Sequence, residues 1–346
     1  MRAARYDTVG APITVRSVPR PVAPPGAAVI DVRATGVCRS DWHAWRGHDP
    51  VPLPITPGHE FAGTVAALGE GVIGWSVGDA VVVPFVNGCG ECEQCLAGDA
   101  QVCPRQTQPG FTHDGSFAEQ VVVRAAAVNL VALPKEIDFV TAASLGCRFA
   151  TAYRAVTGHG TVVAGQWLSV YGCGGVGLAA VQIGAALGLR VVGVDPSAAG
   201  RNRAAELGAE ITVDPVGIDV AERVQELTGG VQLSIDAAGR PDTAVASVMS
   251  LRRRGRHVQV GLLLGANATP PLPMDRVIGW ELTIAGSHGM AAVDYPGMLE
   301  LVARGAVSPA DLVGRVIGLD AAGEALAAMD VPVADAAGMT VIDLSR

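Results

Sequence analysis

The stretch Trp-Leu-Ser-Val-Tyr-Gly-Cys-Gly-Gly-Val-Gly, residues 167–177, decides the fold of this chain. Its apolar first part, 167–171, predicts a buried strand. The strand ends abruptly in the pattern G-x-G-x-x-G, formed by Gly172, Gly174 and Gly177. Glycine triplets also occur in ordinary turns, so the residues after Gly177 decide how this one is interpreted.

A helix and a second strand come after the triplet in register. Residues 176–187 predict a helix that stops at Gly188, and the β-branched run 190–194 predicts a strand that ends in Asp195. In such a unit the glycines permit a tight turn, close approach of a pyrophosphate and close helix packing, while the helix N-terminus offers free N–H groups to phosphates. The combination therefore predicts a dinucleotide site.

Asp195 indicates which dinucleotide binds. Its carboxylate can accept hydrogen bonds from the ribose hydroxyls and would repel a 2′-phosphate, which favours NAD over NADP. Arg201 and Arg203 are near enough to leave some use of NADP open. The residues assigned to cofactor binding in this half are Gly172, Gly174, Gly175, Val176, Gly177, Asp195, Gly261 and Leu262.

A membrane span is the alternative interpretation of the same region. Residues 167–189 contain no charged side chain and are numerous enough to cross a bilayer. The glycines and the strand–turn–helix pattern favour a buried βα unit instead, because parallel strands are apolar on both faces.

Length and charge limit the other interpretations. At 346 residues, two domains are the natural expectation, and a hydrophobic content of 49% is ample for two cores. The net charge is −8, so we expect no nucleic-acid partner, and we interpret the densest basic run, Arg252-Arg253-Arg254, as the solvated end of a helix. The first residues lack the apolar segment of a signal peptide, so we expect a cytoplasmic protein without a membrane partner.

The character of the sequence changes near residue 149. Residues 1–148 contain short β-like runs between turn residues and predict an irregular, mostly β domain. Residues 149–287 alternate strands and helices and predict an α/β domain with a doubly wound, six-stranded parallel sheet, and we assign 288–346 back to the first domain. The expected strands are 28–34, 63–68, 80–84, 120–123, 167–171, 190–194, 211–213, 232–236, 256–261, 282–286 and 339–344. The expected helices include one carrying Val220, Val224 and Leu227, one with Pro241 in its first turn, and 295–303.

Four of the seven cysteines lie in one lobe, at about residues 88–104. They are Cys89, Cys92, Cys95 and Cys103. Four thiolates at short spacings are the ligand set of a closed structural zinc site. An iron–sulfur cluster and disulfides remain the alternatives.

Cys38, His59 and Cys147 form a second candidate set. Together they offer three ligands and would leave a fourth position on zinc open, which is what Lewis-acid chemistry needs. Taken singly each residue has a plainer interpretation, since a buried cysteine is usually a small hydrophobic residue.

These motifs together resemble the zinc-dependent medium-chain alcohol dehydrogenases over nearly the whole chain. The resemblance is carried by residues 36–43, 58–60, 114–119 and 172–177, by Cys147 and by the four-cysteine lobe. It implies a GroES-like catalytic domain combined with a Rossmann domain, and NAD as the cofactor. It also implies two zinc ions per chain, a catalytic one on Cys38, His59 and Cys147 and a structural one on the lobe cysteines.

The resemblance further implies roles for the neighbours of the catalytic set. Ser40 matches the hydroxyl that receives the alcohol proton, and His43 matches the residue that passes the proton to solvent. Asp41 matches a carboxylate that orients the histidine ligand, and Glu60 matches a glutamate beside the metal.

The cofactor contacts implied by the resemblance are incomplete. Arg39 matches a residue that contacts the pyrophosphate. Members often carry a second basic residue in the last strand, where this chain has Gly338-Met339-Thr340, and some carry a lysine where it has Gly200. Both departures lower the expected affinity for the cofactor but do not change which class of cofactor is expected.

The implied reaction is reversible hydride transfer between a primary or secondary alcohol and NAD, in a homodimer or homotetramer. A polyol or threonine dehydrogenase is an alternative, although many polyol enzymes carry a glutamate where Cys147 stands. A zinc-free quinone reductase would lack Cys38, His59 and the lobe, and a non-catalytic zinc- and cofactor-binding protein would have lost the open position or the proton relay. Trp42, Trp45 and Phe85 either line an apolar substrate pocket or belong to the core.

Overall fold

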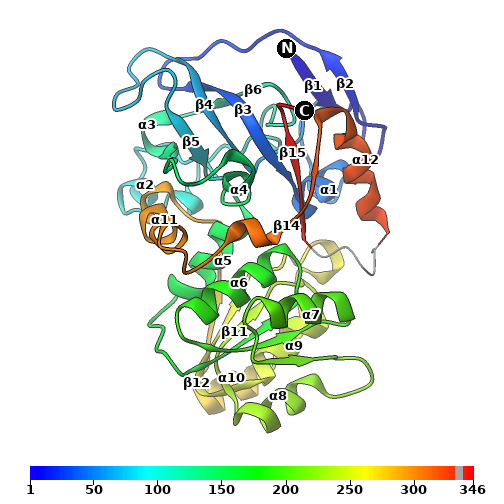
Figure 1. Cartoon of the computed structure of the whole chain (residues 1–346). Helices are drawn as coiled ribbons and strands as arrows, with labels where there is room; N and C mark the ends of the chain where they lie inside the picture. The colour runs from blue at the N-terminus through cyan, green and yellow to red at the C-terminus, as the bar shows by residue number, and fades with distance from the viewer. Residues whose placement is uncertain (332–337) are drawn as a thin grey trace. The chain divides into compact units, whose positions relative to one another are not determined.

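The computed structural model describes residues 1–331 and 338–346. The chain divides into two compact units, which Figure 1 draws with their helices and strands. Unit 1 contains Met1–Ala150 and the described residues from Gly289 onward, and unit 2 contains Thr151–His288. Each unit is built around a large sheet of its own.

Unit 1 is mostly β. Its strands are β1 Arg2–Arg5, β2 Thr14–Ser17, β3 Ala28–Val37, β4 Phe61–Leu68, β5 Ala80–Val83, β6 Gln120–Val123, β7 Val131–Ala132, β14 Val313–Ile317 and β15 Met339–Asp343. The main sheet has the order β14-β15-β3-β4-β5-β7, with β6 also paired to β3, while β1 and β2 form a separate pair. The late strand β15 therefore runs antiparallel beside the early strand β3, as the red and blue arrows of Figure 1 show.

The helices of unit 1 are short and connect or cover the strands. They are α1 Arg39–Trp45, α2 Glu93–Leu96, α3 Ala126–Asn129, α4 Phe139–Ala143, α11 Tyr295–Ala303 and α12 Ala322–Ala327, and α5 Arg148–Thr157 begins in unit 1 and continues into unit 2. The 3-10 turns of the chain are η1 Ala100–Val102, η2 Gly265–Asn267, η3 Ala292–Asp294, η4 Pro309–Leu312, η5 Leu319–Ala321 and η6 Ala328–Asp330. α1 starts at the end of β3 because the backbone N–H of Cys38 donates to the Asp41 carboxylate in the first turn, at 3.0 Å.

Buried aliphatic and aromatic side chains pack on both sides of the unit 1 sheet. One cluster gathers inward-facing residues of β3, β4, β5 and β6, including Ile30 and Phe61. Another contains Tyr6, Trp45 and Phe117 beside α12. Trp45 is 5% exposed, packs in this cluster and donates its indole N–H to the carbonyl oxygen of Ala11, so it is a core residue.

Unit 2 contains six parallel strands in the order β10-β9-β8-β11-β12-β13. The strands are β8 Trp167–Tyr171, β9 Arg190–Val194, β10 Ile211–Val213, β11 Val231–Asp236, β12 Leu251–Gln259 and β13 Thr283–Gly286, and the helices are α6 Gly175–Ala186, α7 Ala198–Glu206, α8 Val220–Thr228, α9 Pro241–Met249 and α10 Met274–Trp280. Numbered along the chain, this order is 3-2-1-4-5-6, the doubly wound dinucleotide-binding arrangement. The predicted fold class is confirmed.

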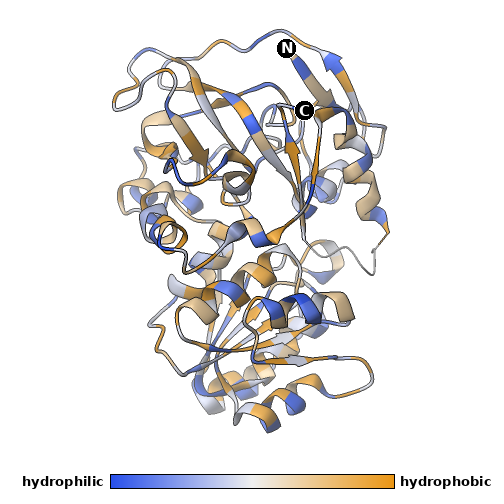
Figure 2. Cartoon of the chain, viewed as in Figure 1, coloured by the Kyte–Doolittle hydropathy of each residue, from blue (hydrophilic) through white to orange (hydrophobic). Residues whose placement is uncertain are grey.

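The agreement is closest where the hydrophobic pattern is strongest. β8, β9, β10 and α11 have the predicted limits. Residues 167–189 form β8 and α6, and no helix in the described part of the chain is long and apolar enough to cross a membrane. Figure 2 shows the underlying pattern: orange predominates along β15, whereas blue bands cross α7.

The interpretation of Arg252-Arg253-Arg254 as the end of a helix is wrong. The three residues belong to β12, which begins at Leu251 instead of Arg256. The pairing of β11 with β12 shifts register between Val231 and Leu233, and Arg254 has a left-handed φ of 60°. Irregular pairing and charged side chains hide the period-2 pattern on which recognition of a strand depends.

Candidate metal centres and cofactor site

Three predicted ligands meet inside unit 1. Cys38, His59 and Cys147 are all buried, and their ligand atoms lie within 4.8 Å of one another. Cys38 precedes α1, His59 precedes β4, and Cys147 lies between α4 and α5. The fold thus brings together residues from three separate connections of the mostly β unit.

Asp41 holds two of these connections in place. Its Oδ2 accepts the backbone N–H of Cys38, and its Oδ1 accepts the backbone N–H of Gly58 at 3.0 Å and Nδ1 of His59 at 2.9 Å. The carboxylate is 1% exposed, so water does not compete for these hydrogen bonds. Because Nδ1 of His59 donates to Asp41, the other ring nitrogen, Nε2, is the one available to a metal ion.

Nε2 of His59 is the observation that tests whether a metal fits. It is buried and has no hydrogen-bond partner among the described residues. An unpaired buried polar nitrogen costs about 1–3 kcal/mol, so it requires an explanation. A divalent ion held by this nitrogen and the sulfur atoms of Cys38 and Cys147 would supply one, and two sulfurs with one nitrogen are a donor set that suits zinc.

The electrostatics of the pocket favour an ionised sulfur. The neighbouring Cys147 thiol lowers the pKa of Cys38, and the nearby His59 ring and the charge of Arg148 act in the same direction. Burial lowers the pKa of His59, but the charge and hydrogen bond of Asp41 and the neighbouring Cys38 together outweigh it, so the net effect raises that pKa. A thiolate beside a correctly oriented imidazole is the form that binds a metal.

Glu60 forms an ion pair that the sequence did not reveal. It is fully buried, and its carboxylate accepts the backbone N–H of Arg148 at 2.9 Å and hydrogen bonds from the Arg148 guanidinium. Burial raises the pKa of Glu60 and the charge of Arg148 opposes that rise. Arg148 directly follows the ligand Cys147, so this buried pair fixes the backbone that carries the ligand.

Ser40 and His43 lie on one face of α1, three residues apart. Oγ of Ser40 is 3.8 Å from the sulfur of Cys38, which places the hydroxyl next to the ligand set. Nδ1 of His43 lies 3.1 Å from Nδ1 of the exposed His48, a neighbour that no motif had indicated. Burial, followed by the charges of His48 and Arg39, lowers the pKa of His43.

Aromatic rings form part of the surroundings of His59. Phe85 and Phe111 contact its ring edge-on, with centroid distances of 5.8 and 5.2 Å. Phe85 was considered from the sequence, whereas no motif pointed to Phe111. Trp42 is partly buried on α1 and donates its indole N–H to Asp330, and Nη1 of Arg39 donates to the backbone carbonyl of Met329 at 2.7 Å.

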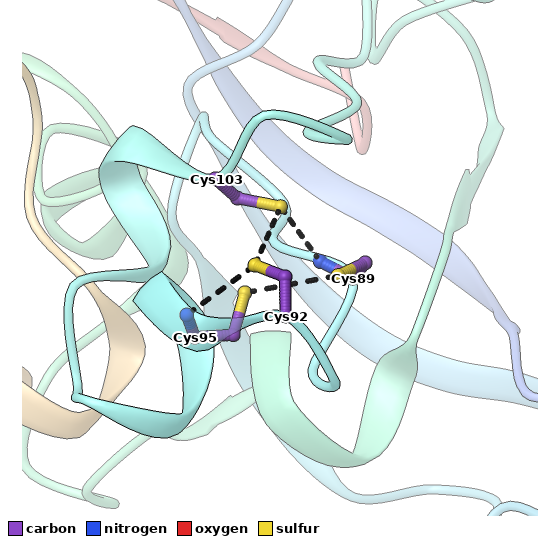
Figure 3. A group of neighbouring side chains, drawn as sticks. All are labelled: Cys89, Cys92, Cys95 and Cys103. Carbon is purple, nitrogen blue, oxygen red and sulfur yellow. Dashed lines mark hydrogen bonds between the residues drawn. The ribbon is translucent and has the colours of Figure 1, made fainter.

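The four cysteines of the lobe form a second sulfur cluster in unit 1 (Figure 3). Their sulfur atoms point toward one another and all lie within 4.8 Å, with 3.6 Å between Cys92 and Cys103 and 4.0 Å between Cys89 and Cys95. All four are free thiols, and these separations are far longer than the ~2.05 Å of a disulfide. The structure therefore does not bear out the disulfide alternative.

The base of the lobe is held by Asn129. Its Oδ1 accepts the backbone N–H of Gly88 at 2.9 Å, and its Nδ2 donates to the Gly88 carbonyl at 2.8 Å. Backbone N–H groups of Cys89, Cys95 and Arg105 point at cluster sulfurs at 3.3–3.5 Å. Such N–H···S contacts stabilise thiolates, so a four-sulfur metal site fits these residues.

The glycine turn of unit 2 has the shape that the sequence predicts. Gly172 has a left-handed φ of 91°, and a Cβ on Gly177 would lie 1.8 Å from the carbonyl oxygen of Gly172, so only glycine allows α6 to pack on the turn. Gly174 caps α6 without a side-chain hydrogen bond, and a Cβ there would meet no atom within 4 Å. The space beside Gly174 is therefore open at the start of α6, where the free N–H groups of a helix can bind a pyrophosphate.

Asp195 closes the turn from the end of β9. Its two carboxylate oxygens accept the backbone N–H groups of Cys173 and Ser197, each at 2.7 Å. Arg201 donates to the carbonyl oxygen of Asp195 and pairs with Asp214, and Arg203 pairs with Glu206.

Asp236 organises the neighbouring strand ends. Its buried carboxylate accepts the backbone N–H of Ala238 at 2.9 Å and Nε2 of Gln259 at 2.8 Å, and its carbonyl oxygen accepts the N–H of Gly261 at 2.8 Å. A Cβ on Gly261 would lie 2.1 Å from the backbone nitrogen of Gly239, so these turns touch through their main chains. Gly261 and Leu262 therefore lie at the carboxyl edge of the sheet, where ligands of such folds bind.

Comparisons with known proteins agree with this geometry. The profile of the alcohol dehydrogenase GroES-like domain matches residues 24–135, and that of the zinc-binding dehydrogenase family matches 175–304. An alcohol dehydrogenase of Geobacillus stearothermophilus is 35% identical over 310 residues, which cover 89% of this chain and 90% of that protein.

Solved structures give the same result at the level of the whole chain. The structure of an NAD-dependent alcohol dehydrogenase has a TM-score of 0.89 and 31% identity, covering 99% of this chain and 100% of that one. An alcohol dehydrogenase from Thermus sp. ATN1 has a TM-score of 0.90 and 29% identity, with 99% of both chains covered.

Proposed function

Because the chain belongs to the zinc-dependent medium-chain alcohol dehydrogenase family and is an oxidoreductase of that kind, we propose that it transfers hydride reversibly between a primary or secondary alcohol and NAD. The product is the matching aldehyde or ketone. The observation that carries this proposal is the unpaired, buried Nε2 of His59 beside the sulfurs of Cys38 and Cys147.

The proposed mechanism assigns each polar group around these ligands a task. When bound, zinc supplies a Lewis acid that lowers the pKa of an alcohol hydroxyl, and NAD supplies the hydride acceptor. Asp41 keeps His59 in the tautomer that presents Nε2. Ser40 accepts the alcohol proton, since its hydroxyl is the polar side chain that lies next to Cys38 on α1.

His43 and His48 carry the proton from Ser40 toward water. They are in contact through their Nδ1 atoms, and His48 is exposed. The lowered pKa of His43 keeps its imidazole mostly neutral at pH 7, the form that can accept a proton. Phe85 and Phe111 present apolar edges at His59, which restricts water near the ligands.

Unit 2 binds the cofactor in the proposed function. The N–H groups at the start of α6 hold the pyrophosphate, and Asp195 favours NAD through its charge near the ribose. The guanidinium groups of Arg201 and Arg203 are paired with carboxylates, which supports the preference for NAD over NADP.

A panel of alcohols and aldehydes tests the proposal when turnover is followed at the nicotinamide absorbance with NAD(H) and NADP(H). We expect alcohol-dependent reduction of NAD, together with two zinc ions per chain, one for each ligand group. Turnover of quinones by a zinc-free protein would instead support a quinone reductase. Zinc and cofactor binding without turnover of any alcohol or aldehyde would refute the catalytic role.

A further inference from the structure

The arginine run of β12 borders a cavity in unit 2. Arg252, Arg254 and Arg256 alternate along the strand, and all three line a cavity of about 150 Å³. Arg253, between them, is not part of this lining and lies over the ring of Trp280. The other lining residues include Trp167 and Gln232.

This cavity lies at the amino ends of the parallel strands. Trp167 is the first residue of β8, and its backbone N–H donates to Oε1 of Gln232 near the start of β11 at 2.8 Å. The glycine turn follows the other end of β8, after Tyr171. The cavity therefore borders the edge of the sheet opposite the proposed cofactor site.

The charges in the cavity are not balanced by the protein. Arg252 and Arg256 form no ion pair among residues 1–331 and 338–346, and the lining contains no carboxylate. Arg254 has one acidic neighbour, Glu281 at 3.6 Å, but both side chains are more than three-quarters exposed. Exposed pairs of this kind are screened by water and contribute little.

The backbone makes room for one of these guanidinium groups. A Cβ on Gly160 would lie 2.0–2.2 Å from the guanidinium atoms of Arg256, so the head group rests directly on the glycine. Burial, followed by the charges of Arg154 and Arg256, lowers the pKa of His159, which directly precedes Gly160. The buried Nε2 of His159 has no hydrogen-bond partner among the described residues.

We propose that this arginine-lined cavity binds a compact multivalent oxyanion of the phosphate class. Guanidinium groups present planar forks of N–H donors that match phosphate oxygens, and their mutual repulsion is relieved by an anion between them. The cavity is smaller than the ~300–1,000 Å³ typical of sites for drug-sized ligands, so the oxyanion is inorganic or part of a small molecule.

The test is calorimetric titration of the zinc-loaded protein with inorganic phosphate, with NAD saturating so that the glycine turn is filled. Matched titrations with sulfate distinguish a phosphate-selective site from a general oxyanion site, and sodium chloride of equal ionic strength controls for screening. We expect saturable binding that weakens about tenfold or more in Arg252→Gln/Arg256→Gln, because the double variant loses charged hydrogen-bond donors to the anion.

The matched control is Arg223→Gln, which removes one positive charge from the exposed Arg223–Glu226 pair on α8 and should leave binding unchanged. If the double variant does not fold, the single variants Arg252→Gln and Arg256→Gln should each weaken binding. No saturable heat with the intact protein, or equal affinity in the arginine variants, would overturn the proposal.

Discussion

At the scale of single residues, Asp41 has the largest expected effect on the metal. One carboxylate accepts hydrogen bonds from Cys38, Gly58 and His59, so it positions two ligands at once. Asp41→Asn should weaken zinc at the Cys38–His59–Cys147 site by about 10–100-fold. Competition with a chromophoric chelator measures this, and Asp7→Asn, which removes half of an exposed ion pair in the same unit, should leave both zinc affinities unchanged.

His43 and His48 allow a test of the proton path. If the proton leaves through the contact between their Nδ1 atoms, His43→Gln should reduce kcat by up to about 10²-fold at low pH and much less at high pH, where hydroxide can take the proton. His48→Gln should give a smaller loss of the same form. A uniform loss across pH, or the same loss in His113→Gln on a separate loop, would contradict the path.

His257 predicts a pH dependence of stability. Burial lowers its pKa to about 4, whereas an unfolded histidine titrates near ~6.5. The folded state therefore binds the proton more weakly, so its stabilisation is complete above pH ~6.5 and is lost as the pH falls toward 4, by roughly 3 kcal/mol in total. Urea unfolding at several pH values should show a steeper loss for the natural chain than for His257→Gln, and parallel curves would refute this origin.

His257 also shows why hydrogen bonds between buried polar side chains could not be predicted from the sequence. Nδ1 of His257 accepts from Ser247, its Nε2 donates to Gln259, and Gln259 donates to Asp236. Spacing gives no sign of this chain, because its members come from β11, α9 and β12. Arg148 and Phe111 were missed for the same reason: each acquires its role only through a contact with a residue distant in sequence.

At the scale of elements, the four-cysteine lobe depends on Gly88. A Cβ at this position would lie 2.9 Å from both the sulfur of Cys95 and the Cβ of Ala100. Gly88→Ala should therefore displace Cys95 and lower the zinc content from two ions per chain toward one. Metal analysis measures the loss, and Gly279→Ala, at a helical glycine whose Cβ would meet nothing within 4 Å, is the control.

The limits of individual strands and helices show where the hydrophobic pattern of the sequence predicts structure and where it does not. β8 and β9 could be bounded to the residue because each is a short apolar run between glycines or charges. α1 was not recognised as a helix, because seven residues are too few for a clear helical period. β12 was bounded wrongly, because its first half is exposed and basic and contains a left-handed residue.

At the scale of the molecule, the two units should respond to different ligands. Unit 1 contains both sulfur-rich ligand groups, and unit 2 contains the glycine turn. Removal of zinc by a chelator should increase amide hydrogen exchange around the lobe and β3–β4. Addition of NAD at 100 times its dissociation constant should stabilise the folded, NAD-binding state against unfolding by about 2.7 kcal/mol. Amide hydrogen exchange should slow first in α6. Equal responses of all peptides to both treatments would contradict this division.

The sequence by itself determined the dinucleotide unit and the existence of a cysteine lobe. Both are local: the strand, turn and helix from 167 to 187 and the four thiols from 89 to 103 are each specified within a short run of chain. The sequence also indicated, through resemblance, that Cys38, His59 and Cys147 belong together.

Only the tertiary structure decided that these three side chains meet, with Nε2 of His59 unpaired near the two sulfurs, and that Glu60 pairs with Arg148, 88 residues away. The tertiary structure also showed that arginines of β12 line a cavity. The physical reason is that local pattern sets backbone conformation, whereas burial, strand register and side-chain direction arise from contacts between distant segments.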